Sequence, residues 1–336
     1  MAYVAYIAVG GEEKLLQFAL NPNDGALTLQ EEIKVDGAPG PLAVDPTQRF
    51  LYVGLRSTCQ LVSFQIEATT GRLQPFGTPV ALDSDPCYLS TDRAGRFLLA
   101  AYYRGGEATV HPIGANGVLG HEAVCTVATM PYAHCIRTDP TNRFAFLPHV
   151  AESNTIVQFR FDAVTGQLTP NTPAQVTPPP GTGPRHYVYH PTKDIVYFSN
   201  EQGGSVTGYQ LDPTQGTLTP FQTLSTLPAD FTGSNTCAKI QIDPAGRFLY
   251  VSNRGHDSIA CFAIDSNGSL TALGQQPTEP TPRAFGLDPA GNFLYATGQG
   301  SGKLTAYRID QDSGRLQPLA TYTIGERPMW VMVLAL

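Results

Sequence analysis

The feature that most constrains this sequence is a repeat of 46 to 52 residues. A turn containing glycine precedes an apolar residue seven times, and successive glycines are 46, 46, 49, 50, 52 and 46 residues apart. These glycines are Gly25, Gly71, Gly117, Gly166, Gly216, Gly268 and Gly314. Because four-stranded propeller blades repeat every 40 to 50 residues or so, the spacing predicts an all-β, seven-bladed β-propeller.

A second signature, a turn followed by an aromatic-rich strand, occurs six times. Its copies include DPTQRFLYV from Asp45, IDPAGRFLYV from Ile242 and LDPAGNFLYA from Leu287. Short alternating runs such as FLYVSN, SIACFAID and SLTALGQ lie between Asp-Pro, Ala-Gly and Asn-Gly turns, which is typical of strands and hairpins. We therefore expect strands throughout and no substantial helix.

The missing seventh copy predicts how the propeller closes. The chain begins directly with AYVAYIAVG, a second strand that lacks a first. We expect the C-terminal strand, Met329 to Leu336, to form the innermost strand of the blade whose other strands come from residues 1 to about 36. The whole chain, 1–336, is then one propeller domain, and removal of its last six residues is expected to open the ring.

Composition excludes several classes of protein. The net charge of -7 and pI near 5.5 argue against a nucleic-acid surface, which needs a basic stripe. No apolar run is long enough for a membrane helix, and the N-terminus lacks the pattern of a signal peptide, so we expect a cytoplasmic protein. The six widely spaced cysteines are interpreted as small buried side chains, not as disulfides or zinc ligands. The sequence does not indicate an oligomeric state.

Residues that break the repeat indicate a site. Taking Asp45 and its equivalents Asp92, Asp139, His190, Asp243 and Asp288 as the origin, we compared equivalent positions in loops that share one face of a propeller. Five positions before the origin stand Gly40, Cys87, His134, Arg185, Ala238 and Arg283. Eleven positions after it stand Arg56, Tyr103, Val150, Glu201, Arg254 and Gln299. The register predicts that His134, Arg185, Glu201, Arg254 and Arg283 converge at one mouth of the channel, with His186, Lys239 and Arg56 nearby.

A group of arginines at one mouth predicts an anionic ligand. Two guanidinium groups about 8 Å apart repel by roughly 2 kcal/mol at an effective dielectric near 20, and each further one adds to the penalty. One carboxylate, Glu201, does not neutralise them all, although Asp230, Glu279 and Asp257 lie in loops where they would offset some charge. Arginine grips phosphate and carboxylate in bidentate fashion, so we expect a small anion.

The candidate chemistry is attack of water on an ester-like carbonyl. His134 beside a carboxylate and several cations is suited to acid/base catalysis, with arginines stabilising the oxyanion. There is no GxSxG elbow for a serine nucleophile and no HExxH motif. We expect neither a metal nor another cofactor.

Several segments resemble a known family. GPRHYVYHP, SNEQGGSV, TPRAFGLDP, PMWVMV and the repeated DPxGRFLYV are similar to the bacterial propeller-type 6-phosphogluconolactonases, in the same order along nearly the whole chain. The resemblance extends to relatives that lactonise carboxy-muconate. It implies that His134 and Glu201 are the proton-transfer groups and that Arg185 and Arg254 hold substrate; Arg283 of PRAF is added as an anion ligand.

The resemblance implies hydrolysis of 6-phosphoglucono-δ-lactone, and we expect the arginines to hold the phosphate and Glu201 or His134 to activate water. A cycloisomerase of the carboxy-muconate type would use the same mouth for a tricarboxylate. A non-catalytic interaction platform would need an exposed apolar patch, and the predicted loops are polar. An enzyme acting on an unphosphorylated sugar lactone would have no use for so many arginines.

Overall fold

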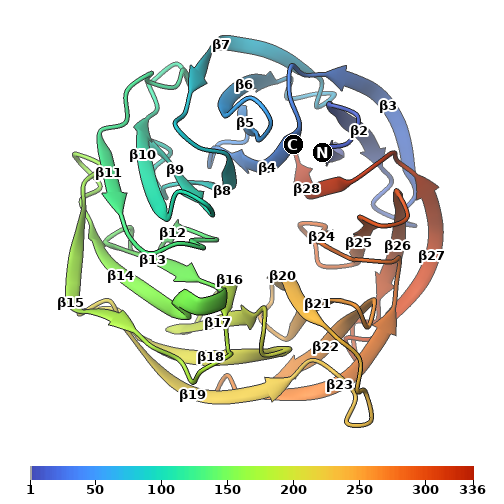
Figure 1. Cartoon of the computed structure of the whole chain (residues 1–336). Coiled ribbons are helices and arrows are strands. Elements are labelled where there is room, and N and C mark those ends of the chain that lie inside the picture. The colour runs from blue at the N-terminus through green and yellow to red at the C-terminus, as the bar shows by residue number, and fades with distance from the viewer. Residues whose placement is uncertain (1) are drawn as a thin grey trace. The chain divides into compact units, whose positions relative to one another are not determined.

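The computed structural model describes residues 2–336, which form strands and one short 3-10 helix, Ala151–Ser153 (Figure 1). The described strands make seven antiparallel sheets of four strands each, as the repeat predicts. The chain divides into two compact units, each considered by itself below. Unit 1 comprises Met1–Lys34, Arg185–Gln210 and Thr219–Leu336, and unit 2 comprises Val35–Pro184 and Leu211–Leu218. No helix within residues 2–336 has the length and apolar character needed to cross a bilayer.

Three sheets lie within unit 1. The first has the order β28-β1-β2-β3, with strands Pro328–Ala335, Tyr3–Val9, Lys14–Leu20 and Leu27–Lys34. The second has the order β20-β21-β22-β23, with strands Thr236–Ile242, Phe248–Arg254, Ser258–Ile264 and Leu270–Pro277. The third has the order β24-β25-β26-β27, with strands Ala284–Leu287, Phe293–Gly298, Lys303–Ile309 and Leu316–Thr323.

Three further sheets lie within unit 2. One has the order β4-β5-β6-β7, with strands Pro39–Val44, Phe50–Leu55, Gln60–Ile66 and Leu73–Ala81. The next has the order β8-β9-β10-β11, with strands Pro86–Thr91, Phe97–Tyr102, Glu107–Pro112 and Cys125–Ala128. The third has the order β12-β13-β14-β15, with strands Arg137–Thr138, Phe144–His149, Thr155–Phe161 and Leu168–Val176. The remaining sheet, β16-β17-β18-β19, has strands Pro184–Tyr189, Ile195–Asn200, Ser205–Asp212 and Thr217–Ser225.

The predicted pairing of the two chain ends is confirmed. Strand β28 pairs antiparallel with β1 from Tyr3 opposite Ala335 to Val9 opposite Pro328. Both strands are largely buried, and they share an apolar cluster that includes Ile7, Val331 and Val333. The C-terminal strand therefore completes the sheet whose other strands open the chain.

The aspartate at the origin of each repeat shapes its turn. Asp45 Oδ1 accepts hydrogen bonds from the backbone N–H groups of Arg49 and Phe50, each at 2.7 Å. Equivalent bonds are made by Asp92, Asp139, Asp243 and Asp288. His190 replaces the aspartate in one repeat, where its Nδ1 accepts the N–H of Thr192 at 3.1 Å. These side chains satisfy turn amides that have no partner in the adjacent ladder.

The two sequence signatures meet where neighbouring sheets pack together. The ring of Phe248 covers the turn glycine Gly314, where a Cβ atom would lie 2.2 Å from the ring. The hydroxyl of Tyr250, two residues further on, donates to the Gly314 carbonyl at 2.9 Å. The same aromatic or aliphatic contact recurs for the pairs Phe50–Gly117, Phe97–Gly166, Phe144–Gly216, Ile195–Gly268 and Phe293–Gly25. The turn glycines are therefore required by close packing as well as by their positive φ angles.

The cysteines are free, and five of the six are buried as expected. Cys59 is the exception: it is partly exposed, because it ends the turn between β5 and β6.

Candidate active site

Unit 1 holds six of the eight site residues predicted from the sequence. Arg185 and His186 belong to strand β16, Glu201 directly follows β17, and Lys239 lies in β20. Arg254 ends β21 and Arg283 directly precedes β24. Arg185, Glu201, Arg254 and Arg283 thus lie at or directly beside strand ends, where the repeat register places them, whereas Lys239 lies in the middle of its strand.

Glu201 lies between two arginines. Its Oε2 is 2.6 Å from Arg185 Nε, and its Oε1 is 3.2 Å from Arg254 Nη2. The Arg185 side chain is 1% exposed, and those of Glu201 and Arg254 are each 14% exposed. A buried guanidinium needs a charged partner, and this carboxylate serves two of them.

The electrostatic balance keeps Glu201 ionised. Burial raises the pKa of this carboxyl, but the positive charges of Arg185, Arg254 and Arg283 lower it, together with a hydrogen bond from Arg254. The net result is a pKa below the usual value for glutamate. Three guanidinium groups thus act on one carboxylate, and these four groups together carry an excess of positive charge.

Backbone carbonyls and a histidine also orient the arginines. Arg254 Nη2 donates to the Cys237 carbonyl at 3.0 Å. Arg185 Nη1 lies 3.2 Å from His186 Nε2 and 3.3 Å from His186 Nδ1, and the ring nitrogen without a proton is the acceptor because guanidinium is only a donor. Such fixed geometry suits recognition of an oxyanion, since little side-chain entropy is left to lose on binding.

Trp330 packs beside two of the candidate residues, Lys239 and His186, and was not among the residues predicted from the sequence. The Lys239 ammonium lies 3.9 Å from the centre of the Trp330 ring, and the His186 ring lies 6.2 Å from it. Trp330, on β28, is the single tryptophan of the chain and is 8% exposed. A signal for it existed: PMW aligns with PRH of β16, which puts Trp330 at the repeat position of His186.

His134 and Arg56 belong to unit 2, and their place beside the arginines stays a prediction. His134 is 4% exposed; its backbone N–H donates to the Pro148 carbonyl at 2.9 Å, and its ring makes an edge contact with Tyr103 at 5.5 Å. Arg56 forms an ion pair with Asp85. An anion binding at Arg56 would therefore compete with a carboxylate already in place.

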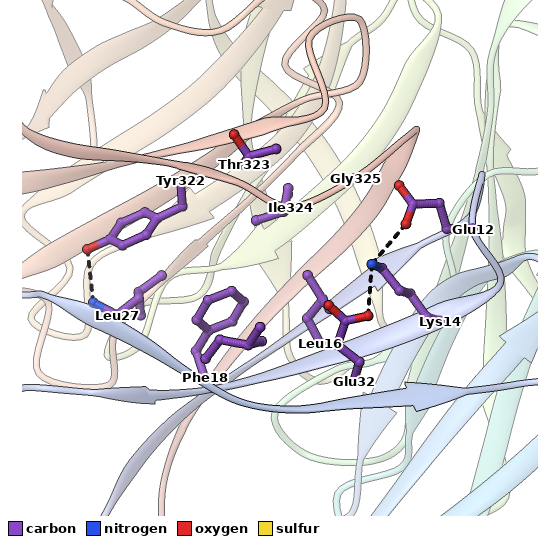
Figure 2. A pocket seen from close by; sticks show the side chains of 11 residues that line it. Glu12, Lys14, Leu16, Phe18, Leu27, Glu32, Tyr322, Thr323, Ile324 and Gly325 are labelled. Atoms are coloured by element: carbon purple, nitrogen blue, oxygen red, sulfur yellow. Dashed lines mark hydrogen bonds and ion pairs between the residues drawn. The ribbon is translucent and has the colours of Figure 1, made fainter.

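A groove of about 430 Å³ lies elsewhere in unit 1, between β2, β3 and the end of β27 (Figure 2). Its floor is apolar, with Leu16 and Phe18. Figure 2 shows Lys14 paired with both Glu12 and Glu32. Its Nζ lies 2.8 Å from Glu12 Oε2 and 3.1 Å from Glu32 Oε2. Because two carboxylates already hold this ammonium, the groove lacks the excess positive charge found around Glu201.

No group of three or more His, Cys, Asp or Glu side chains suited to holding a metal ion occurs among residues 2–336. The functional groups around Glu201 are guanidinium, ammonium and imidazole, which are suited to oxyanions.

Comparison with known proteins agrees with the fold and with the resemblance noted in the sequence. The chain is 40% identical over 337 residues to the 6-phosphogluconolactonase of Pectobacterium carotovorum subsp. carotovorum (strain PC1), and 38% identical over 336 residues to that of Serratia proteamaculans (strain 568). Each alignment covers 100% of both chains. The solved structure of a periplasmic gluconolactonase from Pseudomonas aeruginosa superposes with a TM-score of 0.92 at 25% identity, covering 100% of this chain and 99% of that one. Residues 1–333 match the family described as "Lactonase, 7-bladed beta-propeller". The chain therefore belongs to the seven-bladed β-propeller lactonases.

Proposed function

We propose that this protein hydrolyses 6-phosphoglucono-δ-lactone to 6-phosphogluconate, the lactone-opening step of the oxidative pentose phosphate pathway. The observation that carries the proposal is Glu201 held between the guanidinium groups of Arg185 and Arg254, with the charge of Arg283 also lowering its pKa, in a chain whose full-length relatives bear the name of this activity. A doubly charged phosphate is the ligand that offsets such an excess of positive charge.

Arg185, Arg254 and Arg283 are proposed to hold the substrate phosphate. A planar guanidinium group binds two phosphate oxygens at once, which increases the affinity for the substrate and also fixes the orientation of its sugar. Lys239 adds a point charge whose position is set by its contact with Trp330. His186 completes the group through its hydrogen bond with Arg185.

His134 is proposed as the group that activates water. The water oxygen attacks the lactone carbonyl carbon as its proton passes to the imidazole. The ring C–O bond then breaks, and the same proton passes to the departing alkoxide oxygen. The new carboxylic acid group loses its own proton to solvent, which leaves 6-phosphogluconate. An imidazole is suited to both transfers because its ordinary pKa lies near neutrality.

Glu201 has a different part in this proposal. A carboxylate whose pKa is held below the usual value is a weak base at neutral pH. It stays ionised, and it holds Arg185 and Arg254 in their relative positions. We therefore propose that Glu201 positions the two arginines. If Glu201 were instead the base, its replacement would lower kcat rather than raise KM.

The test is proton release from freshly prepared 6-phosphoglucono-δ-lactone at weakly acidic pH, with glucono-δ-lactone and a carboxy-muconate measured beside it. We expect acceleration with the phosphorylated lactone and a KM that rises at least tenfold in Arg185→Ala, because a charge-assisted hydrogen bond contributes about 1.5–3 kcal/mol. Arg315→Ala, at an exposed turn, is the matched control. An unchanged KM in Arg185→Ala would contradict the phosphate clamp.

The substrate comparison separates the remaining alternatives. Equal turnover of glucono-δ-lactone would favour an unphosphorylated lactone, the substrate class named for the Pseudomonas aeruginosa structure. Turnover of the muconate alone would indicate a cycloisomerase, and inactivity on all three would favour an interaction platform.

The proposed location is the cytoplasm, which fractionation of cells would test.

A further inference from the structure

One backbone position is unusual in all seven sheets. The residue directly before β2, β6, β10, β14, β18, β22 or β26 has a positive φ angle. These residues are Glu13, Cys59, Gly106, Asn154, Gly204, Asp257 and Gly302, with φ between 37° and 68°. Glycine adopts this conformation without cost, and Asn and Asp tolerate it better than other residues. All seven sheets therefore share this turn conformation, whereas the residue type at the position varies from one sheet to the next.

At Asp257 the side chain connects two segments that carry site arginines. Asp257 Oδ1 accepts the N–H of Gly255 at 3.1 Å, directly after Arg254. The same oxygen accepts the N–H of Thr281 at 2.9 Å, two residues before Arg283. One carboxylate thus joins the turn that follows Arg254 to the segment that leads into Arg283.

The segment that Asp257 holds is strained. Thr281 has φ of 56°, which is rare for a β-branched residue. Its carbonyl accepts the N–H groups of Arg283 at 2.8 Å and of Gln299 at 2.9 Å. This conformation turns the chain immediately before Arg283, and it persists only where the surroundings hold it.

A second segment, in unit 2, provides an internal comparison. Asn154 Oδ1 accepts the N–H of Gly183 at 2.7 Å, two residues before Arg185. Gly183 has φ of 64°, which costs glycine nothing. The acceptor oxygen of an amide thus holds the segment before Arg185, and the acceptor oxygen of a carboxylate holds the segment before Arg283, so the shared feature is the acceptor oxygen.

We propose that Asp257 is a positioning residue: its carboxylate locks Thr281 in the left-handed conformation and thereby aims the Arg283 guanidinium at the anion site. Asp257 acts as a hydrogen-bond acceptor, so its charge is not essential. The inference rests on the proposed function, in which Arg283 binds the substrate phosphate. It differs from a simple charge-balancing role, which would require the negative charge itself.

The experiment compares KM and kcat for 6-phosphoglucono-δ-lactone, and the Kd of inorganic phosphate from Trp330 fluorescence, in a matched series of variants. Asp257→Gly keeps the backbone conformation and removes the acceptor, and we expect KM and Kd to rise about tenfold with kcat within about threefold. Asp257→Asn keeps an acceptor oxygen, and we expect values within about twofold of wild type. In Asp257→Gly/Thr281→Gly the strain is gone, so we expect most of the affinity to return.

Two controls separate this inference from its premises. Glu13→Gly changes the equivalent turn in another sheet of unit 1 and is expected to leave KM and Kd unchanged. Arg283→Ala is expected to raise both at least as much as Asp257→Gly does. Amide exchange at Thr281 should be slow in wild type and in Asp257→Asn, and fast in Asp257→Gly.

The outcomes are distinguishable. Unchanged KM and Kd in Asp257→Gly, or equal damage from Asp257→Asn, would overturn the positioning role. Wild-type values in Arg283→Ala would also overturn it, while lactone turnover by wild type would leave the proposed function standing. If wild type does not hydrolyse the lactone, the proposed function fails, and the phosphate Kd and amide exchange still decide whether Asp257 positions an anion-binding arginine.

Discussion

Glu201→Gln tests whether the arginine cluster depends on a buried carboxylate. The carboxylate contacts Arg185 at 2.6 Å and Arg254 at 3.2 Å and is 14% exposed. Removing one partner of a buried ion pair costs about 3–5 kcal/mol. Glutamine keeps one acceptor oxygen for one of the two arginines, so we expect the free energy of unfolding to fall by about 3 kcal/mol at pH 7.

The effect has a defined pH dependence. The pKa of Glu201 is lower in the folded protein than in the unfolded chain, where it lies near 4.3. The ionised carboxylate therefore contributes stability fully above the unfolded pKa and loses it as pH falls through the folded pKa. The difference between wild type and Glu201→Gln should be constant from about pH 7 to 5 and should shrink below about pH 4.

Urea unfolding followed by Trp330 fluorescence measures this difference, because the ring is 8% exposed when folded. Glu32→Gln is the control: its ion pair with Lys14 is 3.1 Å long, but the Glu32 side chain is 48% exposed, so we expect a loss below about 1 kcal/mol. A loss of similar size in both variants, or a Glu201→Gln effect that does not change with pH, would refute the reasoning.

Three further predictions concern packing, closure and binding. Gly314→Ala should lower the free energy of unfolding by about 2–4 kcal/mol, because the new Cβ would collide with Phe248 and the φ angle is unfavourable for alanine. Gly181 also has a positive φ angle but has open space around it, so Gly181→Ala should cost only about 1 kcal/mol. Equal losses would contradict the packing role of the turn glycines. Deleting Val331–Leu336 removes most of the β1–β28 ladder, and we expect loss of the cooperative unfolding transition in calorimetry; a wild-type transition would show that this pairing is dispensable. Inorganic phosphate at constant ionic strength should raise the Tm of wild type, because a ligand at a hundred times its Kd stabilises the folded state by about 2.7 kcal/mol. The shift should be much smaller in Arg185→Ala. Equal shifts in both proteins would indicate a nonspecific salt effect.

Much of the fold could be predicted from the sequence because its determinants are local and repeated. Glycine turns, aspartate-shaped turns and alternating strands occur at nearly constant spacing, and the turn aspartate accepts backbone N–H groups four and five residues further along the chain, as at Asp45. The count of seven four-stranded sheets and the pairing of both chain ends follow from that periodicity. The same register identified Arg185, Glu201 and Arg254 as residues at the ends of strands.

The side-chain contacts around the candidate site are visible only in the tertiary structure, because the sequence repeat does not specify them. The division of the Glu201 oxygens between two arginines depends on side-chain direction at three strand ends, and no spacing rule specifies it. The Lys239–Trp330 contact joins β20 to the C-terminal strand, more than 90 positions later in the chain. The positive φ angle of Thr281 is likewise not visible in the sequence, and the N–H of this residue donates to an acceptor in another turn, Asp257 Oδ1. Local interactions within each repeat thus determined the blades, because every repeat contains them. Contacts between strands far apart in the chain determined which charged side chains of the candidate site pair with one another and how they are oriented.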